Sequence, residues 1–206
     1  MDILELNGLS VETLEALSYH SELNLSLKNT LHHFDKDRLI EELLKMRRWL
    51  NETDLLDEVD LDYRIKSAES IVGKYERYIG TSRQTRQVFN DILGFRGFCD
   101  DYDDVRRLDN KIFHIADMAD GKAKDDGYRG IHAYYETDNF TYPIEIQFNT
   151  LYDRQMNNWL HDYLYKKDYP AGIGKLMRSE YEAGNITNVT EFEEVLNHVL
   201  FGREGC

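Results

Sequence analysis

A group of cations and hydroxyls lies in the first half of this 206-residue chain. Five polar side chains that could contact phosphate fall within twelve residues: Arg64, Lys66, Ser67, Ser70 and Lys74. If a helix begins near Ser67, Ser70 and Lys74 lie on one helix face, beside the free N–H groups and positive dipole end of the first turn. These are the parts of a polyphosphate site. An exposed amphipathic helix with surface lysines would leave the same pattern.

Two carboxylates lie in segments that we predict to be neighbouring strands. Asp91 opens a mostly buried strand over residues 91–99, and Glu145 lies inside a strand over 142–148. Because strand side chains alternate between faces, Glu145 and Gln147 point away from the flanking isoleucines, either to solvent or into a cleft. Two carboxylates on adjacent strands make a natural Mg²⁺ site, with substrate phosphates as the other ligands. A half-exposed sheet face is the alternative.

A glycine-bracketed run precedes another predicted strand. Gly127 and Gly130 enclose Tyr128 and Arg129, and His132 follows two residues later. The permissive backbone allows Tyr128 to present its ring as a stacking platform for a base. His132 could contact a phosphate or pack within the sheet, and the run could equally be an ordinary hairpin loop.

The remaining pattern predicts an α/β (α+β) protein with a mixed central sheet flanked by helices. We expect helices over 24–34, 35–50, 68–78, 151–165 and 191–201, the last capped by Thr190, and strands over 91–99, 111–115, 131–136 and 142–148. We predict a single domain of residues 1–206, with N-terminal helices (1–50), a catalytic core (51–170) and a C-terminal helical extension (171–206). The first fifty residues contain several cations, and we expect most of them to lie on helix surfaces. They include Lys28, Arg47 and Arg48.

Composition limits the possible partners. The net charge of -14 and the pI of about 4.9 argue against whole-surface binding to nucleic acid or anionic lipid, so a polyanion needs a local basic pocket. No signal peptide and no membrane-spanning run is evident. Cys99 and Cys206 show neither metal spacing nor a disulfide framework. We therefore expect a cytoplasmic protein.

Together these runs resemble the synthetase domain of the RelA/SpoT family. The resemblance rests on an ordered set of motifs that spans about eighty residues: Arg64-x-Lys66-x-x-x-Ser70-x-x-x-Lys74, Asp91-Ile92-Leu93-Gly94-Phe95-Arg96, Gly127-Tyr128-Arg129-x-x-His132 and Glu145-Ile146-Gln147. We expect no counterpart of the hydrolase domain and regulatory tail of long members, so the chain looks like a small alarmone synthetase.

The resemblance implies a role for each of these residues. Arg64 and Arg96 would sandwich the ATP adenine, and Lys66, Ser70 and Lys74 would hold the triphosphate. Asp91 and Glu145 would bind Mg²⁺, and Glu145 would help to deprotonate the attacking hydroxyl. Tyr128 would stack on the acceptor base. The remaining residues would contact acceptor phosphate or ribose: Lys122, Lys124, Arg129, His132 and Gln147. The implied reaction moves the β,γ-pyrophosphoryl group of ATP to a ribose 3′-OH.

Three positions depart from the family pattern, all on the acceptor side. Asn149 stands where the family usually has Arg, Gly130 where it has Ser, and Leu160 where it has Glu. The chain therefore resembles most the toxic subgroup of small alarmone synthetases, which modify the 3′-CCA end of uncharged tRNA. In that case Lys28, Arg47 and Arg48 could steer the acceptor stem, and an antitoxin protein would be a partner. A (p)ppGpp synthetase that uses GDP or GTP is the alternative. A non-catalytic nucleotide-binding module is a third hypothesis, against which both carboxylates and the complete set of donor-site residues argue.

Overall fold

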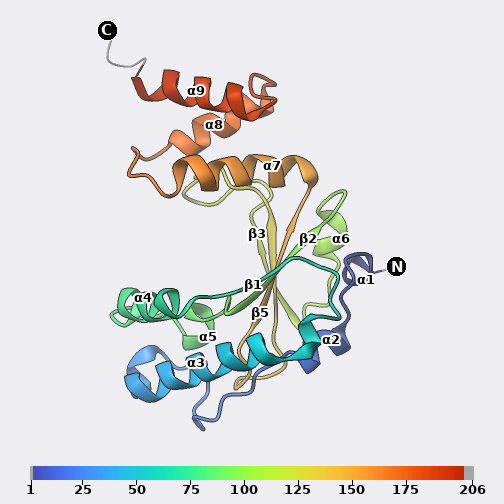
Figure 1. The fold of residues 1–206 in the computed structure, drawn as a ribbon, viewed down its shortest axis with the longest axis vertical. Coiled ribbons are helices and arrows are strands. Elements are labelled where there is room, and N and C mark those ends of the chain that lie inside the picture. Colours follow the sequence, from blue (N-terminus) through green and yellow to red (C-terminus); the bar gives the residue numbers. More distant parts are fainter. Residues whose placement is uncertain (1, 202–206) are drawn as a thin grey trace. The chain divides into compact units, whose positions relative to one another are not determined.

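The structure, a computed structural model, describes residues 2–201 and divides into two compact units, which are treated separately below (Figure 1). The first unit contains the described residues up to Cys99, then Asp103–Ala116 and His132–Phe148. The second contains Asp100–Tyr102, Asp117–Ile131 and the described residues from Asn149 onward. Cys206 lies outside the described residues.

Six helices are assigned in the first unit: α1 (Ile3–Leu6), α2 (Val11–Ala16), α3 (Lys36–Glu52), α4 (Ala68–Tyr78), α5 (Thr85–Val88) and α6 (Asp103–Arg106). Helix α3 begins at Asp35, whose side chain accepts from the amide of Arg38, and it buries Leu39, Leu43 and Met46 at helical spacing. It packs against α4, which in turn packs against α5 (Figure 1).

Except for three terminal strand residues (Asp117, Ile131 and Asn149), the first unit contains a five-stranded sheet of β1 (Tyr63–Ile65), β2 (Leu93–Phe98), β3 (Phe113–Asp117), β4 (Ile131–Tyr135) and β5 (Ile144–Asn149). The strand order is β1-β2-β5-β4-β3. β1 and β2 are antiparallel, with Arg64 opposite Gly94. Along β4 the side chains of Ile131 and Ala133 are buried, and those of His132 and Tyr134 are half-buried on the other face. The predicted mixed sheet with flanking helices is confirmed.

The prediction of a helix over residues 24–34 is wrong. Asn24 has φ of 55°, in the left-handed region, and only a short 3₁₀ turn forms at Leu31–His33. The amide of Leu27 donates to the carbonyl of Asn139 over 2.7 Å instead of to its own turn. A long-range backbone contact therefore overrides the helical spacing of the apolar residues.

The second unit contains α7 (Leu151–Trp159), which continues as a π-helix over Leu160–Leu164, then α8 (Ile173–Glu182) and α9 (Val189–Phe201). Its core includes Met156, Met177 and Phe192. Helix α9 begins before Thr190, and the side chain of Asn188 accepts from the amide of Glu191, so the predicted cap is wrong. Within residues 2–201, no helix is both long and apolar enough to cross a membrane.

Candidate active site

Two lysine side chains converge on the carboxylate of Asp91, just before β2. Lys66 Nζ donates to Oδ2, and Lys74 Nζ donates to Oδ1 over 2.8 Å and to the Val88 carbonyl over 3.0 Å. The Asp91 side chain is 19% exposed, so all three charges are partly buried. Burial raises the pKa of Asp91, but attraction to Lys74 and Lys66 outweighs it and holds the pKa below its ordinary value. Two cations on one carboxylate leave a net positive charge that suits phosphate.

The start of α4 lies directly beside these lysines. Ser67 is the N-cap, and its hydroxyl oxygen accepts from the amide of Ser70 over 3.2 Å. The predicted start of the helix is confirmed, and it places Ser70 and Lys74 one turn apart. A phosphate at this end would meet both the helix dipole and the hydroxyl of Ser70.

Arg64 and Arg96 lie on adjacent strands at the edge of the sheet. Because Arg64 pairs with Gly94, and Arg96 is two residues further along β2, both arginines lie on the same face. Such diagonal neighbours are about 7–8 Å apart, which leaves room for one flat ring between two guanidinium planes. Both residues are exposed. The register is therefore compatible with the predicted adenine sandwich.

Glu145 lies on β5 and is only 7% exposed. The hydroxyl of Tyr134 donates to its Oε1 over 3.2 Å, Gln147 Nε2 donates to its Oε2 over 2.8 Å, and His132 Nδ1 lies 3.0 Å from Oε1. A Cβ atom on Gly94 would lie 3.3 Å from Oε2, so the glycine leaves room for the carboxylate. The sequence allowed Glu145 to point either to solvent or into a cleft. In the structure its carboxylate is buried among polar side chains.

His132 and Gln147, which we expected to contact the acceptor, thus contact Glu145 itself. Tyr134 was not identified from the sequence, although strand alternation places it on the same face as His132. Its ring also lines a cavity of about 460 Å³, whose other walls include Arg83, Arg86 and His114. This cavity extends the polar face of the sheet beyond Glu145.

Tyr128 belongs to the second unit, in the loop that precedes β4. Lys122 Nζ lies 4.8 Å from the centre of its ring and also pairs with the carboxylate of Asp126 over 2.9 Å. The Tyr128 amide donates to Asp126 Oδ1 over 3.2 Å. A cation–π contact therefore occupies part of the ring, and Lys124, four residues earlier, is exposed.

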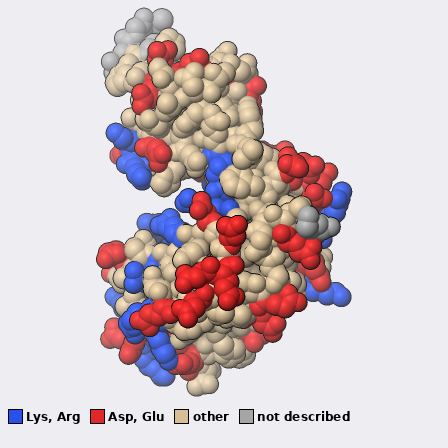
Figure 2. Space-filling view, turned by 45° about the vertical axis from the view of Figure 1, so that its right-hand side comes forward, with Lys and Arg blue, Asp and Glu red and all other residues tan. Residues whose placement is uncertain are grey.

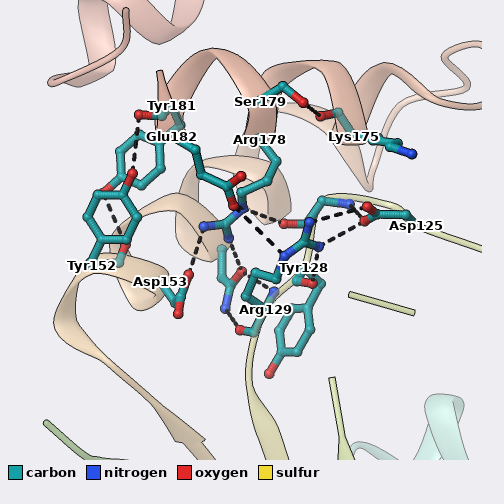
Figure 3. A network of polar contacts seen from close by, with 12 residues as sticks. Asp125, Tyr128, Arg129, Tyr152, Asp153, Lys175, Arg178, Ser179, Tyr181 and Glu182 are labelled. Carbon is teal, nitrogen blue, oxygen red and sulfur yellow. Dashed lines mark hydrogen bonds and ion pairs between the residues drawn. The ribbon is translucent and has the colours of Figure 1, made fainter. Parts of the chain in front are cut away.

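Arg129 is tied into its own unit by both its side chain and its backbone (Figure 3). Its Nη1 and Nη2 donate to Asp125 over 2.9 and 3.2 Å. Its carbonyl accepts from Asn149 Nδ2 over 2.8 Å and from Asn157 Nδ2 over 2.7 Å. The asparagine that replaces the expected arginine at position 149 therefore holds the backbone of the loop.

The three N-terminal cations differ in what they contact. Arg47 Nε donates to the carbonyl of Lys66 over 3.2 Å, so it supports the backbone just before α4. Lys28 and Arg48 are exposed. On the face drawn in Figure 2, acidic side chains gather in broad patches, with smaller groups of basic ones between them. Any polyanion therefore meets local basic groups within an acidic surface.

Comparison with known proteins gives one family. A family model described as the region found in RelA / SpoT proteins matches residues 63–169, just over half of the chain. No curated protein matches the chain.

Solved structures resemble the chain at low identity. They include small alarmone synthetase 1 from Bacillus subtilis bound to its product pppGpp (18% identity, TM-score 0.42, 81% of this chain and 89% of that chain). Small alarmone synthetase 2 from Bacillus subtilis gives 20% identity and a TM-score of 0.48, over 82% of this chain and 99% of that one. A GTP pyrophosphokinase family protein from Streptococcus pneumoniae gives 22% identity and a TM-score of 0.43, over 81% of this chain and 93% of that one.

The matched region contains the Asp91 cluster, the Glu145 site and the loop that carries Tyr128. The chain therefore belongs to the RelA/SpoT family and is a pyrophosphokinase of that type.

Proposed function

We propose that the protein transfers the β,γ-pyrophosphoryl group of ATP to the 3′-OH of the terminal adenosine of uncharged tRNA. The convergence of Lys66 and Lys74 on Asp91, beside the start of α4, carries the donor half of this proposal. When the triphosphate binds, the two ammonium groups exchange part of their contact with Asp91 for phosphate oxygens. Ser70 donates a hydroxyl there, and Arg64 and Arg96 hold the adenine.

In the transfer, the 3′-oxygen forms a bond to the β-phosphorus. The bond from that phosphorus to the oxygen bridging the α- and β-phosphates breaks, and AMP leaves with the electron pair. Glu145 accepts the proton of the 3′-OH, with Tyr134 and Gln147 orienting its two oxygens. The protein contributes mainly positioning and charge neutralisation.

Asp91 and Glu145 would hold Mg²⁺. No three His, Cys, Asp or Glu side chains cluster as a metal site within the part of the chain that the structure describes. Mg²⁺ commonly uses only one or two carboxylates, with waters and substrate phosphates as its other ligands, so two carboxylates fit this ion. Bound Mg²⁺ would neutralise the charge that develops on the phosphates.

Three positions of the second unit support tRNA as the acceptor. Asn149 holds the carbonyl of Arg129, and Leu160 is fully buried in the core, where the family pattern has charged side chains. Gly130 adds no hydroxyl. These replacements remove two charged groups and a hydroxyl from the acceptor side, while Tyr128 still offers a stacking ring. If tRNA is modified in this way, aminoacylation and translation stop, so we also propose an antitoxin protein as a partner.

A (p)ppGpp synthetase is the second candidate, because the ring of Tyr128 stacks on guanine as readily as on adenine. The test is to incubate the protein with γ-labelled ATP and either deacylated tRNA or GDP and GTP. Transfer of label to tRNA, lost in Glu145→Gln, supports the proposal. Label in the nucleotides alone would establish the second candidate, and label in neither, with ATP bound, would exclude both.

Within the second unit, Tyr128→Ala tests the acceptor role directly. Transfer should fall below detection while the dissociation constant for ATP stays within about twofold, since the ring contributes stacking to the acceptor base alone. Tyr152→Ala, which removes a half-exposed ring that stacks on Tyr181, is the matched control. Equal loss of ATP binding and transfer in Tyr128→Ala would refute the role.

A further inference from the structure

Arg178, on α8, is the most completely buried charged residue of the second unit, with 1% of its side chain exposed. Each nitrogen of its guanidinium donates a hydrogen bond (Figure 3). Nε donates to the carbonyl of Gly127 over 2.8 Å, Nη1 to Asp153 Oδ1 over 2.8 Å, and Nη2 to Asn157 Oδ1 over 3.0 Å. One arginine therefore joins three segments that are distant in the sequence.

Two of these three bonds lead to the loop around Tyr128. The first reaches the carbonyl of Gly127, the residue just before Tyr128. The second reaches Asn157, whose Oδ1 also accepts from the amide of Arg129 over 3.2 Å and whose Nδ2 donates to the carbonyl of Arg129 over 2.7 Å. The backbone on both sides of Tyr128 is thus held through one guanidinium.

Helix α8 also touches this loop directly, at two glycines. Gly127 has φ of +89°, and a Cβ atom there would lie 2.3 Å from the carbonyl oxygen of Gly174. A Cβ atom on Gly174 would lie 2.0 Å from the carbonyl oxygen of Asp126. Side chains are excluded at both positions, so the start of α8 and the loop make close backbone contact.

A bond to Gly127 is not needed to neutralise the buried charge. Asp153 already pairs with Nη1, and its other oxygen accepts from the hydroxyls of Tyr102 and Thr150 over 2.7 and 3.0 Å. A lysine could supply that single ion pair. The planar fork of arginine is required only if the loop must be held as well.

We infer that Arg178 is a positioning residue for the acceptor. It and the start of α8 fix the peptide groups on both sides of Tyr128, so that the ring is ordered before the acceptor base arrives. This inference rests on the proposed role of Tyr128, and it makes the C-terminal helices part of the acceptor-binding machinery.

The first test is Arg178→Lys, which keeps a positive charge near Asp153 but cannot span three acceptors. We expect faster hydrogen–deuterium exchange of the amides of residues 125–131, and a fall of about 10- to 100-fold in kcat/KM for the acceptor. The KM for ATP should stay within about twofold. Glu194→Gln, which removes a charge from an exposed position of α9 in the same unit, is the matched control.

Gly174→Ala is the second test, because it presses on the loop while leaving Arg178 in place. Alanine favours the helix itself, so any loss comes from the contact with Asp126. We again expect faster exchange over 125–131 and a lower kcat/KM for the acceptor. Gly80→Ala is the control, since a Cβ atom there meets no atom within 4 Å.

Exchange of the loop is measured without substrate, so it separates this inference from the proposed function. Unchanged exchange in both variants would overturn the positioning role, whatever happens to activity. Faster exchange with unchanged acceptor kinetics would also overturn it, provided that Tyr128→Ala is inactive. If Tyr128→Ala remains fully active, the acceptor role of Tyr128 fails, even where exchange confirms that Arg178 orders the loop.

Discussion

The two units each contain a cluster of charged groups, and the clusters differ in how deeply they are buried and how completely their cations are paired. In the first unit, Lys66 and Lys74 meet a partly exposed carboxylate, Asp91, and their ammonium groups can turn to a ligand. In the second, Arg178 is almost fully buried and spends every nitrogen on the protein itself. A flexible ammonium suits exchange between partners, whereas a planar guanidinium suits a fixed network. The first cluster is thus suited to phosphate and the second to holding a loop.

The largest effect is expected from Arg178→Met, which leaves Asp153 buried without its cation. Breaking a buried ion pair in this way costs about 3–5 kcal/mol of unfolding free energy. Chemical denaturation followed by far-ultraviolet circular dichroism would measure it, with Lys175→Met as control. A loss equal to that of the control would show that the second cluster is no more structural than the surface.

Asp91→Asn should instead remove activity while the fold persists. Loss of a preorganised charge at the reacting phosphates lowers kcat by about 10²–10³-fold. The unfolding transition should move less than in Arg178→Met, because the side chains of Lys66 and Lys74 keep 11% and 21% exposure to solvent, whereas that of Arg178 has 1%. Steady-state transfer assays and denaturation of the same sample give both quantities. A variant that unfolds as readily as Arg178→Met would erase the difference between the clusters.

Lys74→Met should weaken the binding of ATP without changing the affinity for the acceptor. Removal of one charge-assisted hydrogen bond costs about 1.5–3 kcal/mol, or roughly 10- to 100-fold in the dissociation constant for ATP. Calorimetric titration with a non-hydrolysable ATP analogue would measure the affinity. Lys45→Met is the control, because Lys45 pairs with Glu22 on the surface. Similar losses in both variants would mean that Lys74 acts only through general charge.

The smallest effect is a dependence on pH. The folded-state pKa of Asp91 is lowered, so its contribution to stability is complete above the unfolded pKa of about 3.9 and is lost as pH falls through the lower folded value. The difference in unfolding free energy between the native protein and Asp91→Asn should therefore be constant above about pH 5 and shrink below pH 4. A difference that instead grows in acid would place the pKa above its ordinary value.

How much could be predicted from the sequence depended on the range of the contacts involved. Helix α4 and its start near Ser67 were predicted because the signal is local: a hydroxyl before an apolar face. The helix expected over 24–34 failed because Leu27 bonds to Asn139, more than a hundred residues away. Local spacing carries no information about such a partner.

The candidate site followed the same rule. Lys66 and Lys74 belong to one short run of the sequence and lie within 25 residues of Asp91. The structure brings all three side chains together. Arg178 could not be identified, because its partner Gly127 lies 51 residues earlier and no motif joins them. Tyr134 was within reach, since alternation along β4 sets it beside His132 on the face that carries Glu145.

The bond between Arg178 and Gly127 also has a consequence for the order of synthesis. The ribosome makes the chain from its N-terminus at about 5–20 residues per second, so α8 emerges after every residue of the Asp91 cluster, where we propose that ATP binds. A nascent chain could therefore hold ATP before the loop around Tyr128 is ordered. We expect chains that stop at Pro170 to bind labelled ATP but to transfer nothing. The cell would then be exposed to activity only from chains whose translation has passed α8.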